Sequence, residues 1–242
     1  MSKILFIFEG EKTEKQITNN LKKFFISENS VIECAYCSNI YKLYKEISED
    51  EDLDTFQLLK EIPQNKEILE TYNRKDFAEI YMFFDYDGHD NLADDKKVIE
   101  IIDFFNEETE TGKIYISYPM VESLKHYSDL IDFKELKVSA KHNIKYKNLV
   151  DNEAQNELKH FSKYSMQIWK SLIDLHLRKA NYITNNYYTI PLKDGIKQNA
   201  IFINQLDKYL KVDSTVAVLS SFPAFLFEYY GYDYICNFLT EE

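Results

Sequence analysis

The stretch Ile80-Tyr81-Met82-Phe83-Phe84-Asp85-Tyr86-Asp87-Gly88 is an unbroken apolar run that ends in two aspartates one residue apart. Such a run suits a strand that is buried on both faces, as in parallel sheets covered by helices. Residues two apart in an extended chain point to the same side, so we expect Asp85 and Asp87 to reach one cation or one water together. Open α/β sheets bind their ligands at this carboxyl edge. The competing interpretation is a pair of solvated turn residues beside Gly88.

A second apolar run, residues 4–8, has the same character and ends in an acid, Glu9, followed by a glycine. Thr13, with Gln16 three residues later, has the pattern of a helix N-cap with a capping box. Glu9 is therefore expected at a strand-to-helix junction, the same topological position as Asp85. A helix start at this position favours an anion such as phosphate. The simpler alternative is that Glu9 only stabilises the dipole of the helix.

The rest of the N-terminal half alternates between strand and helix patterns. Short apolar runs at 31–36 and 113–117 predict strands, and apolar residues at helical spacing predict helices over 40–47 and from Asn91, as N-cap, to 105. Weaker helical patterns lie at 56–62 and 68–72. Four strands alternating with helices predict an α/β domain with a mainly parallel sheet and right-handed crossovers.

The C-terminal half is predicted to be largely helical. Pro119 suits the first turn of a helix over 120–130, and the longest helical pattern spans 158–180. A late strand is expected at 216–219, and a further helix starts with the apolar residues 224–227. No repeat or low-complexity segment interrupts the chain.

The composition is that of a compact protein of 242 residues. Hydrophobic residues make up 45% and aromatic residues 15%, with only 5 glycines and 4 prolines, which excludes a disordered chain and a flexible linker. Three cysteines agree with a reducing compartment. The chain start has no signal-peptide cleavage pattern, and no stretch reaches the roughly 18 apolar residues of a spanning helix. We expect a cytoplasmic protein without membrane attachment.

The formal net charge of −12 argues against a protein that holds nucleic acid by its overall charge. The charge is unevenly distributed, however, because residues 134–147 contain five lysines against one glutamate. A second basic region, 159–179, contains four lysines and one arginine. These regions could form a positive surface for nucleic acid, and the alternative is that their basic residues are ordinary surface side chains.

Two of these motifs carry a resemblance to a known family. Glu9-Gly10-Glu11-Lys12-Thr13-Glu14 after the first strand, together with Asp85-Tyr86-Asp87 after a later one, resembles the Toprim domain of topoisomerases, primases and OLD-type nucleases. Tyr118-Pro119-Met120-Val121-Glu122-Ser123-Leu124 is similar to an element that follows the sheet in RloB-like and abortive-infection proteins of bacterial anti-phage defence. The chain departs from that element after Glu122, where it has Ser123 and Leu124. The resemblance covers residues 3–127.

The resemblance implies a fold and a set of site residues. The fold would be a Toprim-like Rossmann-type core over 1–127, with a mainly parallel sheet flanked by helices, and a mainly helical extension over 128–242. Glu9 would be an acid/base or a metal ligand, Asp85 and Asp87 would hold Mg²⁺ or Mn²⁺, and Glu122 would assist. Contacts to nucleic acid are expected from four lysines: Lys12, Lys141, Lys145 and Lys147.

The implied activity is metal-dependent phosphodiester cleavage in RNA, with tRNA among the candidates, or in DNA. Mg²⁺ binds a few carboxylates and keeps several waters, so the three acids would suffice. Implied partners are the nucleic acid and a protein such as a defence-system ATPase, and a homo-oligomer is left open. The alternative function is a non-catalytic module that binds nucleic acid or a nucleotide as a sensor.

Competing sites in the sequence are weaker. Cys34 and Cys37 have the spacing of a zinc knuckle, but no second Cys/His pair stands at a matching distance, so we expect no zinc. His89 and His126 lie near the acidic motifs and could contact the metal or phosphate, and the simpler interpretation of both is a polar surface histidine. No Walker loop is present, so ATP hydrolysis by this chain has no support.

Overall fold

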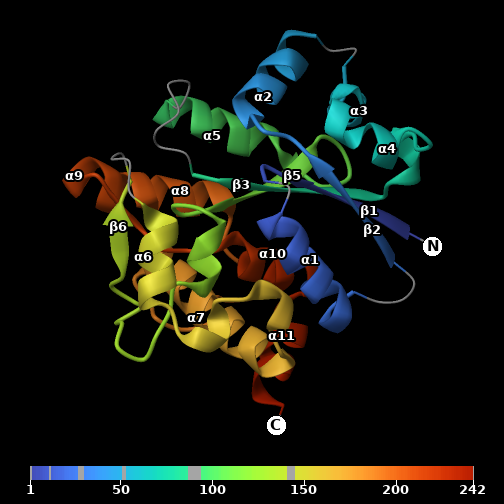
Figure 1. Cartoon of the computed structure of the whole chain (residues 1–242). Coiled ribbons are helices and arrows are strands. Elements are labelled where there is room, and N and C mark those ends of the chain that lie inside the picture. Colours follow the sequence, from blue (N-terminus) through green and yellow to red (C-terminus); the bar gives the residue numbers. More distant parts are fainter. Residues whose placement is uncertain are drawn as a thin grey trace. The chain divides into compact units, whose positions relative to one another are not determined.

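The computed structural model describes residues 2–10, 12–26, 30–50, 53–86, 94–140 and 145–241 (Figure 1). The chain divides into two compact units. The first unit comprises Met1–Phe84 and Leu92–Ile114, and the second comprises Asp85–Asn91 and Tyr115–Glu242. The domain boundary expected after residue 127 stays a prediction.

A five-stranded sheet has the strand order β2-β1-β3-β5-β4. The strands are β1 (Ser2–Phe8), β2 (Ser30–Tyr36), β3 (Glu79–Asp85), β4 (Asn106–Glu107) and β5 (Gly112–Ser117). Strand β1 pairs in parallel with both β2 and β3, whereas the two-residue strand β4 pairs with β5 in an antiparallel manner. The predicted α/β class with a mainly parallel sheet is confirmed.

The apolar runs form strands because both faces of β1 and β3 are buried. Phe6 has no exposed surface, and its ring contacts the rings of Phe8, Tyr81 and Phe83 at centroid distances of 5.1–6.0 Å. Phe8 is in register with Tyr36 on one side and with Phe83 on the other. The carboxyl ends of these three strands therefore lie side by side, as parallel pairing requires.

Five helices belong to the first unit: α1 (Thr13–Phe24), α2 (Ile40–Glu49), α3 (Thr55–Glu61), α4 (Lys66–Leu69) and α5 (Asp95–Phe104). Two short 3-10 turns, η1 (Pro63–Asn65) and η2 (Arg74–Asp76), accompany them. Figure 1 shows α1 on one face of the sheet and the other four helices on the opposite face. The strands are thus covered on both sides, which explains their unbroken apolar sequences.

Helix starts in the first unit differ from the prediction in detail. The predicted N-cap at Thr13 is wrong, because Lys12 occupies that position in a helical conformation and makes no side-chain cap. The N-cap therefore lies one residue before the predicted position. Helix α5 is capped by Asp94, whose side chain accepts from the Lys96 N–H, while Asn91 lies outside the described residues.

Among its described residues, the second unit contains short helical turns and five longer helices. The longer helices are α6 (Tyr146–Glu153), α7 (Met166–Asn185), α8 (Gln198–Gln205), α10 (Ser221–Tyr230) and α11 (Tyr232–Thr240). The short turns are η3 (Val121–Lys125), η4 (Asn156–Leu158), η5 (Phe161–Lys163), the π-helical η6 (Leu206–Leu210) and α9 (Lys211–Asp213). Helix α7 packs against α8, α10 and α11. The expected helical character of this part is confirmed.

Two strands, β6 (Lys137–Ser139) and β7 (Thr215–Ala217), form a separate antiparallel sheet in this unit. The late strand expected at 216–219 is present as β7, and Leu219 continues it as a bridge to Tyr118. Its partner β6 was not predicted, because three residues with only partial burial leave no periodic pattern in the sequence.

Two predicted helices are wrong in their extent. Residues 120–130 form only the 3-10 turn η3, preceded by a cis Tyr118–Pro119 peptide bond. All five side chains of η3 are buried, so tertiary contacts and not helical periodicity determine this segment. The long helix starts at Met166 and not near 158, because Ser165 caps it by accepting from the Ile168 N–H.

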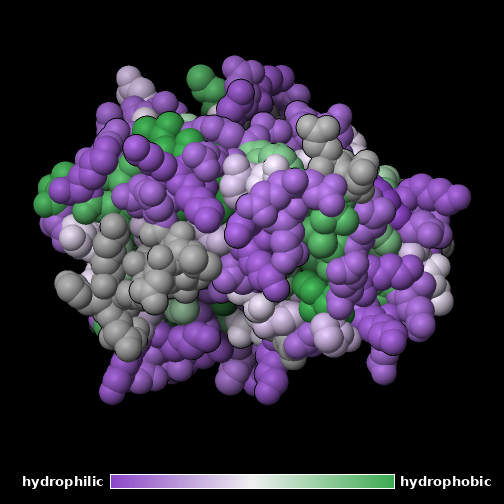
Figure 2. All heavy atoms as spheres, turned by 90° about the horizontal axis from the view of Figure 1, so that it is seen from above, coloured by the Kyte–Doolittle hydropathy of each residue, from purple (hydrophilic) through white to green (hydrophobic). Residues whose placement is uncertain are grey.

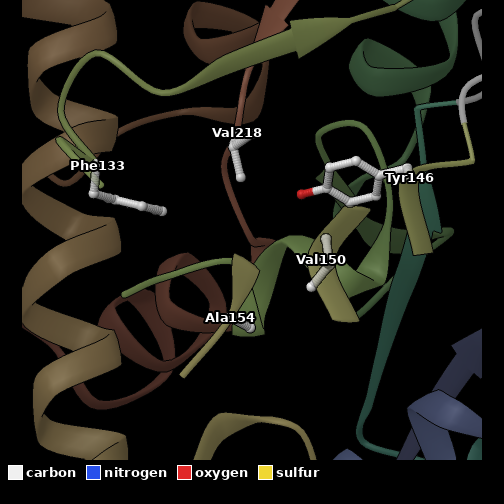
Figure 3. Close-up of a cluster of buried hydrophobic side chains, with 5 residues drawn as sticks. All are labelled: Phe133, Tyr146, Val150, Ala154 and Val218. Atoms are coloured by element: carbon white, nitrogen blue, oxygen red, sulfur yellow. The ribbon is translucent and has the colours of Figure 1, made fainter. Parts of the chain in front are cut away.

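A buried apolar cluster in the second unit joins α6 to distant segments (Figure 3). It consists of Phe133, Tyr146, Val150, Ala154 and Val218, and the Tyr146 hydroxyl points toward the interior of the cluster. Tyr146 and Val150 lie on one face of α6 at a spacing of four residues, and Ala154 directly follows the helix. The cluster therefore fixes the face that α6 presents to the rest of its unit.

The face drawn in Figure 2 is mostly hydrophilic, and its hydrophobic side chains lie in small separate groups. In the described part of the chain, no helix combines the length and the apolarity needed to cross a bilayer.

Candidate functional site

Asp85 is the last residue of β3 and is half-buried. Its Oδ1 accepts a hydrogen bond of 2.8 Å from the backbone N–H of Val121, at the start of η3. An amide donor to a carboxylate is a charge-assisted hydrogen bond and fixes the orientation of the acid. The structure thereby connects the Asp85 carboxylate to the residue that precedes Glu122.

Glu122 lies in η3 with only 5% of its surface exposed. Its Oε1 is 3.5 Å from Nζ of Lys147, an exposed lysine of α6. Its Oε2 is buried and has no hydrogen-bond partner among the described residues. A buried carboxylate oxygen without a donor is costly, and a cation next to it would remove that cost.

The charges of Asp85 and Glu122 act on the same group, the hydroxyl of Tyr146. Burial raises the pKa of Tyr146 well above its usual value, and the carboxylates of Glu122, Glu153 and Asp85 raise it further, in that order. Two of the predicted site acids, one from β3 and one from η3, therefore contribute to the raised pKa of one buried hydroxyl in the second unit.

His126 holds the Tyr146 hydroxyl in place. Its side chain has no exposed surface, its Nδ1 is 2.9 Å from the Tyr146 hydroxyl, and its Nε2 is 2.9 Å from Oε2 of Glu153. Because the carboxylate can only accept, Nε2 carries the proton and Nδ1 accepts from Tyr146. Burial lowers the pKa of His126, although Glu153 opposes the shift. The expectation of a surface histidine is therefore wrong for His126, and His89 lies outside the described residues.

Three side chains of the segment 122–126 pair with α6. Besides the Glu122–Lys147 and His126–Glu153 contacts, Nζ of Lys125 donates to Oδ1 of Asp151 at 2.9 Å. Sequence reasoning missed Tyr146 and Glu153. The spacing of Tyr146 and Val150 would have indicated a shared buried face of α6 but not the contact of that helix with η3, and the exposed Glu153 leaves no such pattern.

The basic regions are mixed in character. Lys145 is exposed directly before α6, and Lys137 forms an ion pair with Asp213. Lys179, by contrast, is fully buried and donates to the carbonyl oxygens of Phe133 and Leu136 at 2.7 and 2.6 Å. Burial lowers the pKa of Lys179 well below its usual value. The interpretation as a surface side chain is wrong for Lys179, because these carbonyls replace water around its ammonium group.

Glu9 and Lys12 belong to the first unit. Glu9 is half-buried directly after β1, and Lys12 is exposed at the start of α1. Asp87 and Lys141 lie outside the described residues. The structure thus brings Asp85 and Glu122 together in one unit, with Lys147 beside Glu122. In the described ranges no three acidic, histidine or cysteine side chains converge as a complete metal site.

Gly10, next to Glu9, is held by the buried Glu14. The Gly10 N–H donates to Oε1 of Glu14 at 3.2 Å, and a Cβ on Gly10 would come within 2.7 Å of both carboxylate oxygens. A Cβ at this position would therefore push the Glu14 carboxylate away from the Gly10 N–H.

Gly10→Ala is expected to lower the free energy of unfolding by about 1–2 kcal/mol, because it breaks a charge-assisted hydrogen bond at a buried acid. Urea unfolding of the wild type and the variant measures this. A Gly10→Ala variant as stable as the wild type would contradict the role given to Glu14.

The cysteine pair has no feature of a zinc site so far as the structure describes it. Burial raises the pKa of both thiols, that of Cys37 to about 11, and the Cys37 Sγ lies 3.7 Å from the backbone carbonyl of Asn39. Zinc binds the thiolate, which a raised pKa disfavours. The expected absence of zinc stays a prediction.

Comparison with known proteins identifies no relative, since no family model, no curated protein and no solved structure matches the chain.

Proposed function

We propose that the chain is a Toprim-like nuclease that cleaves phosphodiester bonds in RNA or DNA and depends on Mg²⁺ or Mn²⁺. The observation that carries the proposal is the buried Glu122 carboxylate, whose Oε2 has no described hydrogen-bond partner, directly after the residue whose backbone N–H orients the carboxylate of Asp85. Carboxylate oxygens are the ligands that both ions prefer. The residues therefore fit a divalent cation.

In this proposal Asp85 and Glu122 hold the ion, and Asp87 is the predicted third ligand. A bound ion would polarise the phosphate and lower the pKa of a bound water. The Val121 amide keeps Asp85 oriented, and Lys147 balances the charge of Glu122. The Tyr146 hydroxyl donates its hydrogen bond to Nδ1 of His126, so it does not compete for the carboxylate oxygens that the ion needs.

Glu9 as acid/base, the choice between RNA and DNA, and a role in anti-phage defence with an ATPase partner rest on the resemblance and stay predictions. The alternative, a module that binds nucleic acid or a nucleotide without cleaving it, shares the metal site. It differs only in the absence of cleavage. Incubation of the wild type with Mg²⁺ or Mn²⁺ and end-labelled RNA and DNA separates the two functions.

Glu122→Gln is expected to raise the melting temperature of the metal-free protein and to weaken Mn²⁺ binding by at least about tenfold. Removing the charge relieves the cost of a buried, unpartnered carboxylate oxygen but also removes a ligand. Differential scanning fluorimetry across a Mn²⁺ titration measures both effects, since a ligand that binds only the folded state raises the melting temperature with its concentration.

Glu157→Gln is the matched control, because Glu157 is an exposed glutamate of the same unit. Its Mn²⁺ titration should follow that of the wild type. If Mn²⁺ raises the melting temperature of wild type and Glu122→Gln equally, Glu122 does not bind the ion. If the ion has no effect on the wild type, the proposed metal site is wrong.

A further inference from the structure

A cleft of about 650 Å³ lies in the first compact unit, at the carboxyl ends of β1 and β2. Phe8 and Gly10 line it from the end of β1, and Tyr36 lines it from the end of β2. The other walls come from the exposed face of the first two turns of α1 and from the segment 64–68. Its volume lies within the usual range for small-ligand sites, about 300–1,000 Å³.

The charge of the cleft is opposite to that of the chain. Lys12 and Lys15 line it, and none of its described lining residues is acidic, although the whole chain has a net charge of −12. The two lysines are three residues apart and share one face of the helix start. Both are exposed, and neither has an ion-pair partner among the described residues. They are therefore available to an anionic ligand.

The remaining polar groups of the cleft are carboxamides. Gln16, Asn19 and Gln64 are exposed and line it together with the half-buried ring of Tyr36. Carboxamides pair with the hydrogen-bonding edges of bases, and tyrosine rings stack on bases. This lining suits a ligand that combines a phosphate with a base and does not suit a bare inorganic anion.

The wall formed by Tyr36 is fixed by Asn65, which is fully buried. Oδ1 of Asn65 accepts from the Tyr36 N–H at 2.7 Å, and its Nδ2 donates to the carbonyls of Tyr36 and Leu59 at 2.8 and 2.9 Å. Two of these hydrogen bonds hold the end of β2 against η1, and the third ties η1 to α3. The cleft is preformed on this side, which lowers the entropic cost of binding.

We propose that this cleft binds a nucleoside monophosphate unit, with the phosphate at Lys12 and Lys15 and the nucleoside at Tyr36 and the carboxamides. The unit belongs either to a single-stranded nucleic acid or to a free nucleotide. The first case rests on the proposed function, because the strand would be the substrate of the nuclease. Binding at the cleft requires neither metal nor cleavage.

The test is the fluorescence anisotropy of labelled single strands of about ten nucleotides, RNA and DNA, in EDTA. Lys12→Gln/Lys15→Gln is expected to weaken binding about tenfold or more at low salt and to reduce the salt slope by about 0.7 for each lost phosphate contact. Lys15→Gln alone should show about half of the change in slope. Lys23→Gln is the matched control, because Lys23 is exposed in the last turn of the same helix and does not line the cleft.

Gln64→Leu distinguishes a nucleoside site from charge attraction alone. It should weaken binding several-fold without changing the salt slope, because it removes hydrogen bonds but no charge. Wild-type affinity in this variant would overturn the nucleoside part of the proposal. Equal affinities of wild type, Lys12→Gln/Lys15→Gln and Lys23→Gln would overturn the whole.

Competition with unlabelled mononucleotides identifies the source of the ligand. If mononucleotides displace the strand at similar concentrations, the cleft binds free nucleotides. If only strands compete, the cleft binds part of a longer strand. These measurements are independent of the proposed function, since a wild type that binds strands through the cleft but never cleaves them would refute the nuclease and leave the cleft assignment intact.

Discussion

Asp85→Asn is expected to reduce metal-dependent cleavage of nucleic acid by at least about 100-fold, equivalent to about 3 kcal/mol in the activation barrier. The substitution removes a negative charge from the proposed metal site. It also keeps an oxygen that can accept from the Val121 N–H, the bond that joins β3 to η3 at 2.8 Å. The fold should therefore survive, and the loss should appear in the rate and not in the melting temperature.

The measurement compares initial cleavage rates of wild type and Asp85→Asn on labelled RNA and DNA at saturating Mg²⁺, after both have been shown to melt alike. Asp194→Asn is the control, because Asp194 is an exposed aspartate of the same unit. A folded Asp85→Asn that cleaves at the wild-type rate would exclude this acid from the reaction. The same assay on Glu9→Gln and Asp87→Asn tests the two residues that only the sequence assigns.

Acidification from about pH 6.5 to about pH 4 is expected to lower the free energy of unfolding by about 3 kcal/mol through His176 alone. His176 is buried in α7, and its Nδ1 accepts from the Ser220 N–H at 3.0 Å. Burial lowers the pKa of His176 to about 3, with a further contribution from the nearby charge of Lys179. The folded state thus keeps this histidine neutral, whereas the unfolded chain protonates it below about pH 6.5.

Stability falls on acidification because the pKa of His176 is lower in the folded state than in the unfolded chain. The stabilisation is complete above the unfolded pKa and is lost as the pH falls, by up to about 1.4 kcal/mol for each pH unit. His126, whose pKa is also lowered by burial, acts in the same direction. Urea unfolding at a series of pH values measures the slope.

His176→Gln keeps an acceptor for the Ser220 N–H but cannot be protonated. The variant should be less stable at neutral pH, and its stability should depend less on pH, by up to one proton below about pH 6. His160→Gln, at an exposed histidine, is the control and should retain the wild-type slope. If the wild type and His176→Gln lose stability in parallel on acidification, His176 is not the source of the pH dependence.

The sequence was sufficient where burial is uniform along an element. Residues 4–8 and 80–84 are apolar at every position because helices cover both faces of β1 and β3, so strand, class and carboxyl-end acids could all be predicted. The conformation of the segment after Pro119 could not be predicted from the sequence. Its conformation depends on pairings of Lys125 and His126 with α6, about 25 residues further along the chain.

The candidate site also contains residues that the sequence could predict and residues that it could not. Asp85 was recognisable because it ends an apolar run, a local signal. The roles of Tyr146 and Glu153 come from the burial of His126, a long-range packing effect that single-sequence periodicity does not contain. The cleft in the first unit was also invisible to the sequence, except for Lys12, because its lining comes from three separated segments.

The hydrogen bond from the Val121 N–H to Asp85 gives the protein a built-in spectroscopic reporter. The chemical shift of an amide proton depends on the charge and distance of its acceptor, and this acceptor is the carboxylate that the proposed function assigns to the cation. In an NMR spectrum of ¹⁵N-labelled protein, the Val121 resonance should therefore move with the occupancy of the site. One backbone signal would then follow cation binding without a substrate or a label at the site.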